Sequence, residues 1–347
     1  MKRYAKLYPR IADLDNVVLA HANAQKGKRH YAEVKRVNRS QDAYLGHLYR
    51  LLKDRAYRTS EYTVSVRNDT GKERVIYVLP YYPDRIVHHA VMQVLEPIWE
   101  RVLIRDTYSA IKGRGVHDGV RRVKKMLEDE PGTRYCLKMD VAKFYPSIDH
   151  EVLKSILRRK IKCPDTLELL DEIVDSAPGV PIGNYLSQYF GNLYLAYFDH
   201  WVKEGLRVRH YARYCDDLVV FGSSKDRLHE TRRRIAAYLH DELRLHLKEN
   251  WQVFPTRVRG VDFLGYRFFG SYTLVRKSIA KKFKARMARV RTRPGPTSPN
   301  SVMSYYGWCK HADTRGLWEA YVDQGVRQAV ARICSQTQIS NPLKEAA

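Results

Sequence analysis

The stretch RYCDDLVVFG, residues 213–222, places two adjacent aspartates between two short runs of apolar residues. Both runs are rich in aromatic or β-branched side chains, so the stretch predicts a hairpin with Asp216 and Asp217 at its turn. Adjacent carboxylates repel each other unless a cation neutralises them, and carboxylate oxygens are ligands that Mg²⁺ prefers. An ordinary turn is the alternative interpretation, because aspartate also tolerates turn geometry.

A third aspartate lies far upstream of this hairpin. Asp140 ends the β-rich run RYCLKMD in the segment LKMDVAKFYPSIDH, residues 137–150. If its strand pairs beside the hairpin, carboxylates converge from two strand ends. Two divalent ions about 3.5–4 Å apart could then activate an attacking hydroxyl and stabilise a leaving oxygen.

The order of predicted elements is strand, helix, hairpin, helix and strand, which is typical of a split βαβ sheet with helices on one face. We therefore expect an α+β fold. Residues 1–60 are predicted to be helical and basic, and residues 61–80 to form two strands joined by a turn at 68–71. Further helices are predicted over residues 150–161, 166–175, 184–205 and 225–244, with a small β element at 261–270.

The chain is strongly basic, with 62 Lys and Arg against 38 Asp and Glu, a formal charge of +24, and 25 tyrosines. Nine of the basic residues lie between 276 and 293, where no acidic residue occurs. Such clustering favours a nucleic-acid partner over a merely solvated surface. The five cysteines show no Cys-x-x-Cys spacing, which argues against a disulfide framework or a cysteine zinc site and predicts a reducing cytoplasm. No apolar run is long enough to cross a membrane.

Together, YCDD at 214–217 and the upstream Asp140 segment closely resemble the reverse transcriptases. The resemblance implies a right-hand polymerase, with fingers, a palm built on an antiparallel split-βαβ sheet, and a helical thumb. The implied boundaries are a basic helical N-terminal extension at 1–60, fingers at 61–134 interleaved with the palm, a palm at 135–262, and a primer-grip hairpin and thumb at 263–347.

The resemblance also implies the roles of individual residues. Asp140, Asp216 and Asp217 would be catalytic and would hold two Mg²⁺ ions, with Mn²⁺ as a substitute and the Val141 carbonyl as a further ligand. Tyr145 matches the bulky residue that excludes a ribose 2′-hydroxyl, although a core aromatic is the alternative. Lys72 and Arg74 share one face of a predicted strand and would hold a triphosphate, and Lys248 would lie near the leaving pyrophosphate.

Several segments are expected to contact template or primer. Arg114 lies in a Gly-rich segment that matches a template-proximal element of the family, and VDFLGYRF at 261–268 resembles the primer-grip hairpin. The basic run after it would be a phosphate-tracking thumb helix with salt-dependent binding. The predicted template and primer contacts are Arg114, Leu264, Gly265, Tyr266, Lys277, Lys281, Lys282 and Arg286.

One segment departs from most of the family. Where most relatives carry a Gln-Gly pair, this chain has Ile182-Gly183, followed by Ser187-Gln188. This pattern resembles the reverse transcriptases of diversity-generating retroelements, which copy a template RNA into cDNA with errors opposite adenine and so diversify a target gene. Ile182, Gly183 and Gln188 would lie at the nucleotide site. The implied partners are template RNA, the cDNA primer or product, dNTPs, and a small basic oligomeric accessory protein, with no membrane.

Two other functions stay open at this point. One is a retron-type or group II intron-type reverse transcriptase of ordinary fidelity, and the other is an inactive RNA-binding scaffold. The complete set of three aspartates argues against the scaffold. A zinc deaminase is excluded, because the His-x-Glu and Pro-Cys-x-x-Cys patterns are missing.

Overall fold

The computed structural model describes residues 2–69, 72–338 and 340–344. They form two compact units, each assembled from separate parts of the sequence. The first unit comprises residues 1–112, 139–218 and 230–251, and the second comprises residues 113–138, 219–229 and 252–347. Within the described ranges, no helix combines the length and the apolar character needed to span a bilayer.

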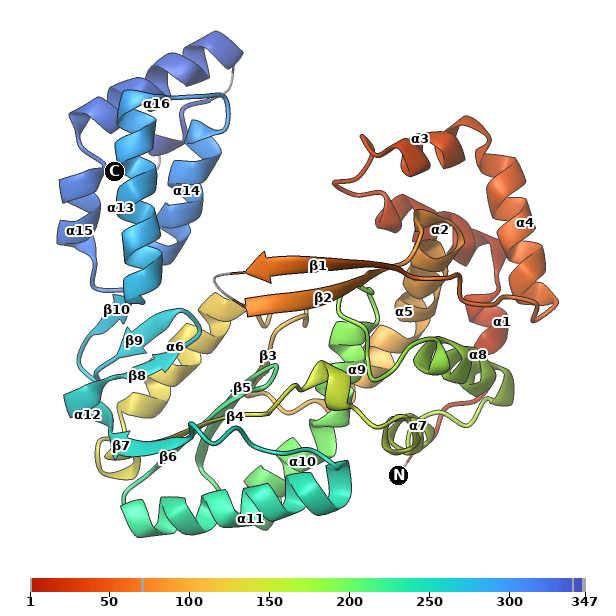
Figure 1. Cartoon of the computed structure of the whole chain (residues 1–347), viewed down its shortest axis with the longest axis horizontal. Coiled ribbons are helices and arrows are strands. Elements are labelled where there is room, and N and C mark those ends of the chain that lie inside the picture. Colours follow the sequence, from red (N-terminus) through yellow and green to blue (C-terminus); the bar gives the residue numbers. More distant parts are fainter. Residues whose placement is uncertain (1, 70–71, 339, 345–347) are drawn as a thin grey trace. The chain divides into compact units, whose positions relative to one another are not determined.

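Four helices occupy most of residues 8–53, within the region that the sequence predicted to be helical. Asp13 caps helix α2 (Leu14–Ala24) by accepting hydrogen bonds from the backbone N–H groups of Asp15 and Asn16. Helix α2 packs along α5 (Ile86–Trp99), and Asn23 Nδ2 donates to Gln93 Oε1 at 2.8 Å between them (Figure 1). The neighbouring helices are α1 (Tyr8–Ile11), α3 (Ala32–Arg39) and α4 (Gln41–Lys53).

The predicted hairpin near residue 70 is present in the first unit. Strands β1 (Thr63–Asp69) and β2 (Lys72–Val78) pair antiparallel, with Arg67 opposite Arg74. The two residues between the strands lie outside the described ranges. Val64 and Val66 of β1 are more than half exposed, so this hairpin is not buried in a core within the structure.

A five-stranded sheet carries the aspartate motifs. Its strand order is β3-β5-β6-β4-β7, so β4 and β6 are neighbours although they are far apart in sequence. Strand β3 pairs in parallel with β5 at the edge, where the sequence pattern predicted no strand. The strands are β3 (Thr107–Tyr108), β4 (Tyr135–Asp140), β5 (His210–Tyr214), β6 (Asp217–Gly222) and β7 (Gln252–Pro255).

One predicted helix is interrupted. The helix expected over 184–205 starts at Ser187 and breaks at Leu195, whose φ of −96° and ψ of 1° are not helical. The run has no proline or glycine at this point, so its sequence carries no breaking signal. The resulting elements are α9 (Ser187–Tyr194), α10 (Ala196–His200) and a π-helical turn (Trp201–Gly205).

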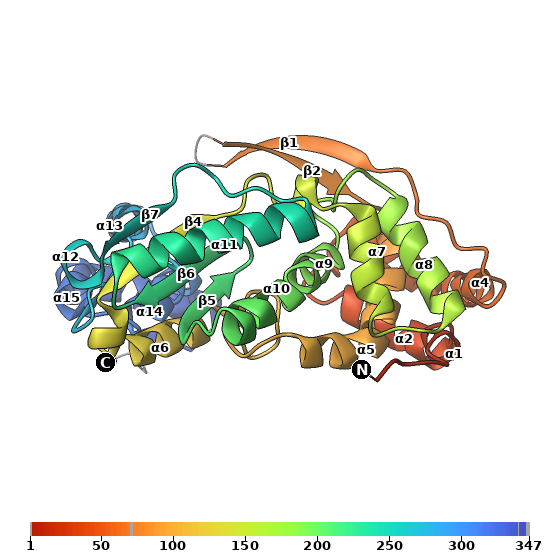
Figure 2. The same cartoon turned by 90° about the horizontal axis from the view of Figure 1, so that it is seen from below.

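The helices predicted at 150–161, 166–175 and 225–244 are present with similar bounds. Helices α7 (His150–Arg158) and α8 (Pro164–Asp175) lie side by side in both views (Figure 2). Near them, Tyr4 forms a β-bridge with Ile161, which ties the N-terminal segment to the end of α7. The other two helices are α6 (Val116–Leu127) and α11 (Lys225–Leu243).

The C-terminal part of the second unit is a small sheet followed by a helical bundle (Figure 1). Phe283, Met287 and Val290 form an apolar stripe on α13 and are buried against the other helices. The bundle contains α13 (Lys277–Thr292), α14 (Ser298–Cys309), α15 (Arg315–Tyr321) and α16 (Gln324–Thr337). The sheet contains β8 (Val261–Phe263), β9 (Tyr266–Phe268) and β10 (Thr273–Val275), preceded by the short helix α12 (Thr256–Arg259).

Candidate active site

The strand order brings two of the predicted catalytic aspartates together. Asp140 is the last residue of β4, and Asp216 immediately precedes β6. The backbone N–H of Val141 donates to the Asp216 carbonyl at 3.1 Å, which fixes the two chain segments against each other. Asp216 and Asp217 are both half-buried. The tertiary fold therefore places Asp140 and Asp216 near each other.

Lys248 supplies a positive charge to this cluster. Its Nζ lies 3.6 Å from Asp140 Oδ1 and 3.9 Å from Asp216 Oδ2, so it contacts both carboxylates. Its backbone N–H donates to the Asp140 carbonyl at 2.8 Å, and Ala142 N–H donates to His246 O at 2.8 Å. These bonds align the segment around Lys248 with the end of β4. Lys248 therefore lies beside Asp140 and Asp216 in the fold.

The pKa of Asp216 is raised above its ordinary value. Burial is the largest cause, and the nearby Asp140 carboxylate raises the pKa further. The charges of Lys248 and Arg74 act in the opposite direction but do not cancel the effect. The ionised carboxylates therefore repel each other in this site, and an added cation would relieve that repulsion.

The buried side chain of Arg213 contacts the turn that carries Asp216 and Asp217, referred to here as the aspartate turn. Arg213 and Asp199 are both fully buried, and Arg213 Nη2 donates to Asp199 Oδ2 at 2.6 Å. Arg213 Nη1 also donates to the Cys215 carbonyl at 3.0 Å. Sequence reasoning missed this pair, although an arginine between the buried strand residues Ala212 and Leu218 was a usable signal, because a buried charge requires a partner.

Cys215, between Tyr214 and the aspartates, has a positive φ of 54°. Its Sγ donates to Ser109 Oγ at 3.1 Å, and Ser109 follows directly after β3. Asn192 Nδ2 donates to the Ser109 carbonyl at 2.9 Å. Strand β3, which the sequence did not predict, therefore leads directly to Ser109, and Ser109 contacts Cys215 in the aspartate turn.

Tyr145 lies beside the same turn. Its hydroxyl is 4.0 Å from Cys215 Sγ, and its ring packs against Gly191 of α9, where an added Cβ would lie 3.0 Å from the ring. Burial is the largest cause of a raised pKa for the Tyr145 hydroxyl, and the nearby Cys215 raises it further. The side chain is therefore uncharged at physiological pH. The neighbouring Phe144 is only 3% exposed and is the core aromatic of the segment. Tyr145 itself is half-buried and close to the carboxylates.

The Ile182-Gly183 segment docks on the hairpin strand β2. Tyr77 N–H donates to the Ile182 carbonyl at 3.0 Å. Gly183 has a φ of 127°, and an added Cβ would lie 2.3 Å from the Tyr77 carbonyl oxygen, so this position requires glycine. Ile182 is half-buried, whereas Gln188 is exposed in the first turn of α9.

The predicted triphosphate residues lie on β2. Arg74 is exposed, and its charge is close enough to lower the pKa of Asp216. Lys72 begins the strand, but its side chain lies outside what the structure describes. One of these two cations is therefore placed within electrostatic reach of the aspartates.

The other predicted contacts belong to the second unit. Leu264 and Gly265 form the tight turn between β8 and β9, both with positive φ. Tyr266 is fully buried, and its hydroxyl donates to the Trp308 carbonyl at 3.0 Å, so its role in this structure is packing. Arg114 is half-buried just before α6. On α13, Lys277, Lys281 and Lys282 are exposed and Arg286 is half-buried.

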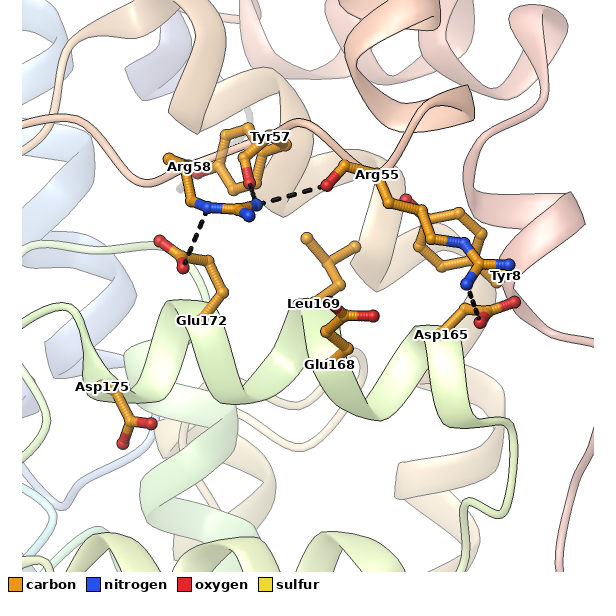
Figure 3. Close-up of a pocket in the computed structure, with 9 residues that line it drawn as sticks. All are labelled: Tyr8, Arg55, Tyr57, Arg58, Asp165, Glu168, Leu169, Glu172 and Asp175. Carbon is orange, nitrogen blue, oxygen red and sulfur yellow. Dashed lines mark hydrogen bonds and ion pairs between the residues drawn. The ribbon is translucent and has the colours of Figure 1, made fainter.

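A separate cavity lies between α8 and the segment around Arg55 (Figure 3). Arg55 pairs with Asp165 at 2.8 Å, and Arg58 lies 4.0 Å from Glu172. Tyr8 closes one end, and its hydroxyl donates to the Leu52 carbonyl at 2.6 Å. These ion pairs attach α8 to the N-terminal helices, and the cavity contains none of the predicted catalytic residues.

The family assignment rests on residues 66–268, the part of the chain that contains the aspartates and Lys248. The family model described as "Reverse transcriptase (RNA-dependent DNA polymerase)" matches residues 66–268, which is more than half of the chain and includes Asp140, Asp216 and Lys248. The chain belongs to the reverse transcriptase family. The resemblance noted from YCDD and the Asp140 segment is confirmed at this level.

Two curated relatives are similar at low identity. Protein YkfC of Escherichia coli (strain K12) is 26% identical over 249 residues, which cover 59% of this chain and 65% of YkfC. The group II intron-encoded protein LtrA of Lactococcus lactis subsp. cremoris is 20% identical over 279 residues, covering 59% of this chain and 46% of LtrA. The chain thus spans less than two thirds of the length of either relative.

Among solved structures, apo telomerase from Candida tropicalis matches with a TM-score of 0.52 at 14% identity, over 81% of this chain and 57% of that chain. At this identity the match concerns the fold alone. The predicted α+β right-hand polymerase fold is confirmed.

Proposed function

We propose that this reverse transcriptase is an RNA-directed DNA polymerase, which extends a primer strand by nucleotidyl transfer from dNTPs. The observation that carries the proposal is the convergence of Asp140 and Asp216 around Lys248, within the segment that matches the family. In this proposal, residues 61–134 contribute fingers, 135–262 the palm, and 263–347 the primer grip and thumb.

The donor groups suit a divalent cation such as Mg²⁺. Carboxylate and carbonyl oxygens are its preferred ligands, and the raised pKa of Asp216 indicates a site where added positive charge is favourable. Across the described ranges, no group of three or more His, Cys, Asp or Glu is already gathered in a metal-binding arrangement. Asp140, Asp216, Asp217 and the Val141 carbonyl would hold two ions. When bound, the ions would activate the primer hydroxyl and stabilise the leaving oxygen.

The chain's own residues would position the nucleotide. Arg74, with Lys72, would bind the triphosphate from the hairpin strand, and Lys248 would neutralise charge near the leaving pyrophosphate. The neutral ring of Tyr145 beside the aspartate turn would lie under the sugar. A 2′-hydroxyl would then collide with the ring, which excludes ribonucleotides by steric contact.

Primer extension tests the polymerase proposal directly. The chain would be given an RNA template containing adenines, an annealed primer, dNTPs and Mg²⁺, and the products would be sequenced. Extension that depends on RNA template and divalent metal is expected. Tight RNA binding without any synthesis, with and without added protein partners and native RNA, would replace the proposal with the RNA-binding scaffold.

Replacing Tyr145 with alanine should let the enzyme incorporate ribonucleotides. Removing the ring opens space where a 2′-hydroxyl would sit, so the preference for dNTPs over rNTPs should fall by at least about tenfold. Competing dNTP and rNTP incorporation on one template measures the ratio. Tyr145→Phe, which keeps the ring, is the control. An unchanged ratio in Tyr145→Ala would show that the ring is only a packing residue.

We propose further that the chain belongs to the error-prone reverse transcriptases of diversity-generating retroelements. The feature that favours this subtype is Ile182-Gly183, where the Ile182 carbonyl accepts a hydrogen bond from Tyr77 of β2. The subtype implies a structured template RNA and a small basic oligomeric accessory protein as partners. A retron-type or group II intron-type enzyme of ordinary fidelity is the alternative, and the similarity to LtrA is compatible with it.

Replacing Ile182 with glutamine should lower the error rate. Glutamine can donate and accept hydrogen bonds with a nascent base pair or its sugars, so a wrong pair would leave a polar group of the site without a partner. Isoleucine can only pack, so a wrong pair carries no such penalty in the wild type. We expect misincorporation opposite template adenine to fall by roughly tenfold, a difference of about 1.4 kcal/mol. Sequencing cDNA from wild type, Ile182→Gln and Ile182→Leu measures it. Equal error rates in all three would contradict the hypothesis.

A further inference from the structure

A closed circuit of hydrogen bonds includes the aspartate turn. Arg213 Nη1 donates to Asn192 Oδ1 at 3.3 Å and to the Cys215 carbonyl at 3.0 Å. Asn192 Nδ2 donates to the Ser109 carbonyl at 2.9 Å, and Cys215 Sγ donates to Ser109 Oγ at 3.1 Å. These four residues, called the circuit below, come from three separate segments of the first unit.

The circuit lies in the interior of the first unit. Ser109, Asn192 and Arg213 are buried, and Cys215 is half-buried. A buried polar network whose members all have partners is rigid. Removing one member leaves its neighbour without a partner in a place that water does not reach, which is costly. The circuit can therefore hold the residues that it contacts in one arrangement.

Two residues of the circuit have left-handed backbone. The φ angle is 91° at Ser109 and 54° at Cys215, although neither residue is glycine. Such conformations persist only where the surrounding contacts hold them. At Cys215 the circuit contacts both the carbonyl and the thiol. Asp216 follows directly, so its position depends on the conformation that the circuit holds at Cys215.

Helix α9 connects the circuit to Tyr145. Two consecutive residues of this helix make the connection, because Gly191 lies against the Tyr145 ring and Asn192 belongs to the circuit. The Tyr145 hydroxyl also lies 4.0 Å from Cys215 Sγ. A shift of Cys215 would therefore change the distance between the aspartate turn and the ring that would lie under the sugar.

We propose that Ser109, held in place by Asn192, is a positioning residue for nucleotidyl transfer. It acts through Cys215, by fixing Asp216 at the end of β4 and the Tyr145 ring beside the turn, and it does not touch the nucleotide. This inference rests on the proposed function for the reaction that is affected. It goes beyond the site residues assigned above, because it gives the segment after β3 an effect on rate and on sugar selectivity.

Replacing Ser109 with alanine tests the inference, because it removes the hydroxyl that accepts from Cys215. The amide of Val141 reports on the turn directly, since it donates to the Asp216 carbonyl. Native-state hydrogen exchange at Val141 should become about tenfold faster in Ser109→Ala, the effect of one lost hydrogen bond on a local opening. This measurement needs neither metal nor nucleotide.

Single-nucleotide incorporation measures the effect on the reaction. In Ser109→Ala the rate at saturating dNTP should fall about tenfold, with KM for dNTP changed less than about threefold, because misplaced reacting groups mainly affect kcat. The preference for dNTPs over rNTPs should fall at least about threefold, since the Tyr145 ring gains freedom. A merely structural role would reduce the amount of folded protein and leave the sugar preference unchanged.

Three further variants separate the circuit from a general loss of stability. Thr133→Val removes a buried hydroxyl that donates to the Asp129 carbonyl at 2.7 Å, outside the circuit, and should leave exchange at Val141 and the sugar preference unchanged. Cys215→Ala should reproduce Ser109→Ala, whereas Cys215→Ser keeps a donor and should stay close to the wild type. The double variant Ser109→Ala with Cys215→Ala should lose no more than the larger single loss, because both changes remove one contact.

Unchanged exchange at Val141 in folded Ser109→Ala, or additive losses in the double variant, would overturn the inference. If Ser109→Ala does not fold, Cys215→Ala makes the same test from the other side of the contact. Polymerisation by the wild type, with unaltered exchange, rate and sugar preference in Ser109→Ala, would remove the positioning role and keep the proposed function. Faster exchange in Ser109→Ala, in a chain whose wild type does not polymerise, would support the hold of the circuit on the turn and reject the proposed function instead.

Discussion

Replacing Asp216 with asparagine should lower the rate of primer extension by at least about a thousandfold, because metal-assisted charge stabilisation contributes several kcal/mol to the transition state. Asparagine keeps the shape of the side chain but removes the carboxylate that, with Asp140, would hold the ions. Single-turnover incorporation of one dNTP measures the chemical step separately from strand binding. Primer–template affinity should stay close to that of the wild type.

The same substitution should not reduce stability. The pKa of Asp216 is raised in the fold, so its ionised form is disfavoured there at neutral pH, and a neutral side chain removes that cost. We expect a melting temperature equal to or above that of the wild type. Asp241→Asn, at an exposed position outside the site, is the matched control and should retain full activity. Near-normal extension by Asp216→Asn would reject the assignment of the catalytic aspartates.

Replacing Arg213 with methionine should destabilise the fold by about 3–5 kcal/mol, because Asp199 would remain buried without its positive partner. Both side chains are 0% exposed, and two donors of Arg213, Nε and Nη2, bond to Asp199. Burial alone would lower the pKa of Arg213, yet Asp199 more than offsets this and raises it, so the guanidinium is charged in the fold. Urea unfolding at neutral pH measures the loss.

A second substitution separates the lost pair from lost packing. Arg213→Met with Asp199→Leu removes both charges and should recover part of the stability. Recovery should be partial, because Tyr211 and Thr107 donate hydrogen bonds to Asp199 at 2.6 and 2.9 Å and would lose their acceptor. Arg233→Met breaks an exposed pair with Glu230 and should cost less than about 1 kcal/mol. A similar small cost for Arg213→Met would contradict the prediction.

The sequence by itself determined the local elements and the family. Alternating or β-rich runs predicted strands within 61–80, 213–222 and 261–270, and the family resemblance implied a basic helix after them. Strands and a helix are present in these regions. These signals are local, since hairpin pairing and helical periodicity act between residues that are near in sequence. The YCDD motif and the Asp140 segment identified the family because both motifs occur in the order that reverse transcriptases have. They could not show how close the carboxylates lie.

Only the tertiary structure decided how these elements combine. The placement of β4 between β6 and β7 brings Asp140, Asp216 and Lys248 together, and no local pattern encodes that order. The same holds for the burial of Arg213 on Asp199 and for the position of Gly183 against the β2 backbone. Each depends on contacts between segments far apart in the chain. Such contacts form only where burial and hydrogen bonding across the whole fold outweigh the entropy of bringing distant segments together.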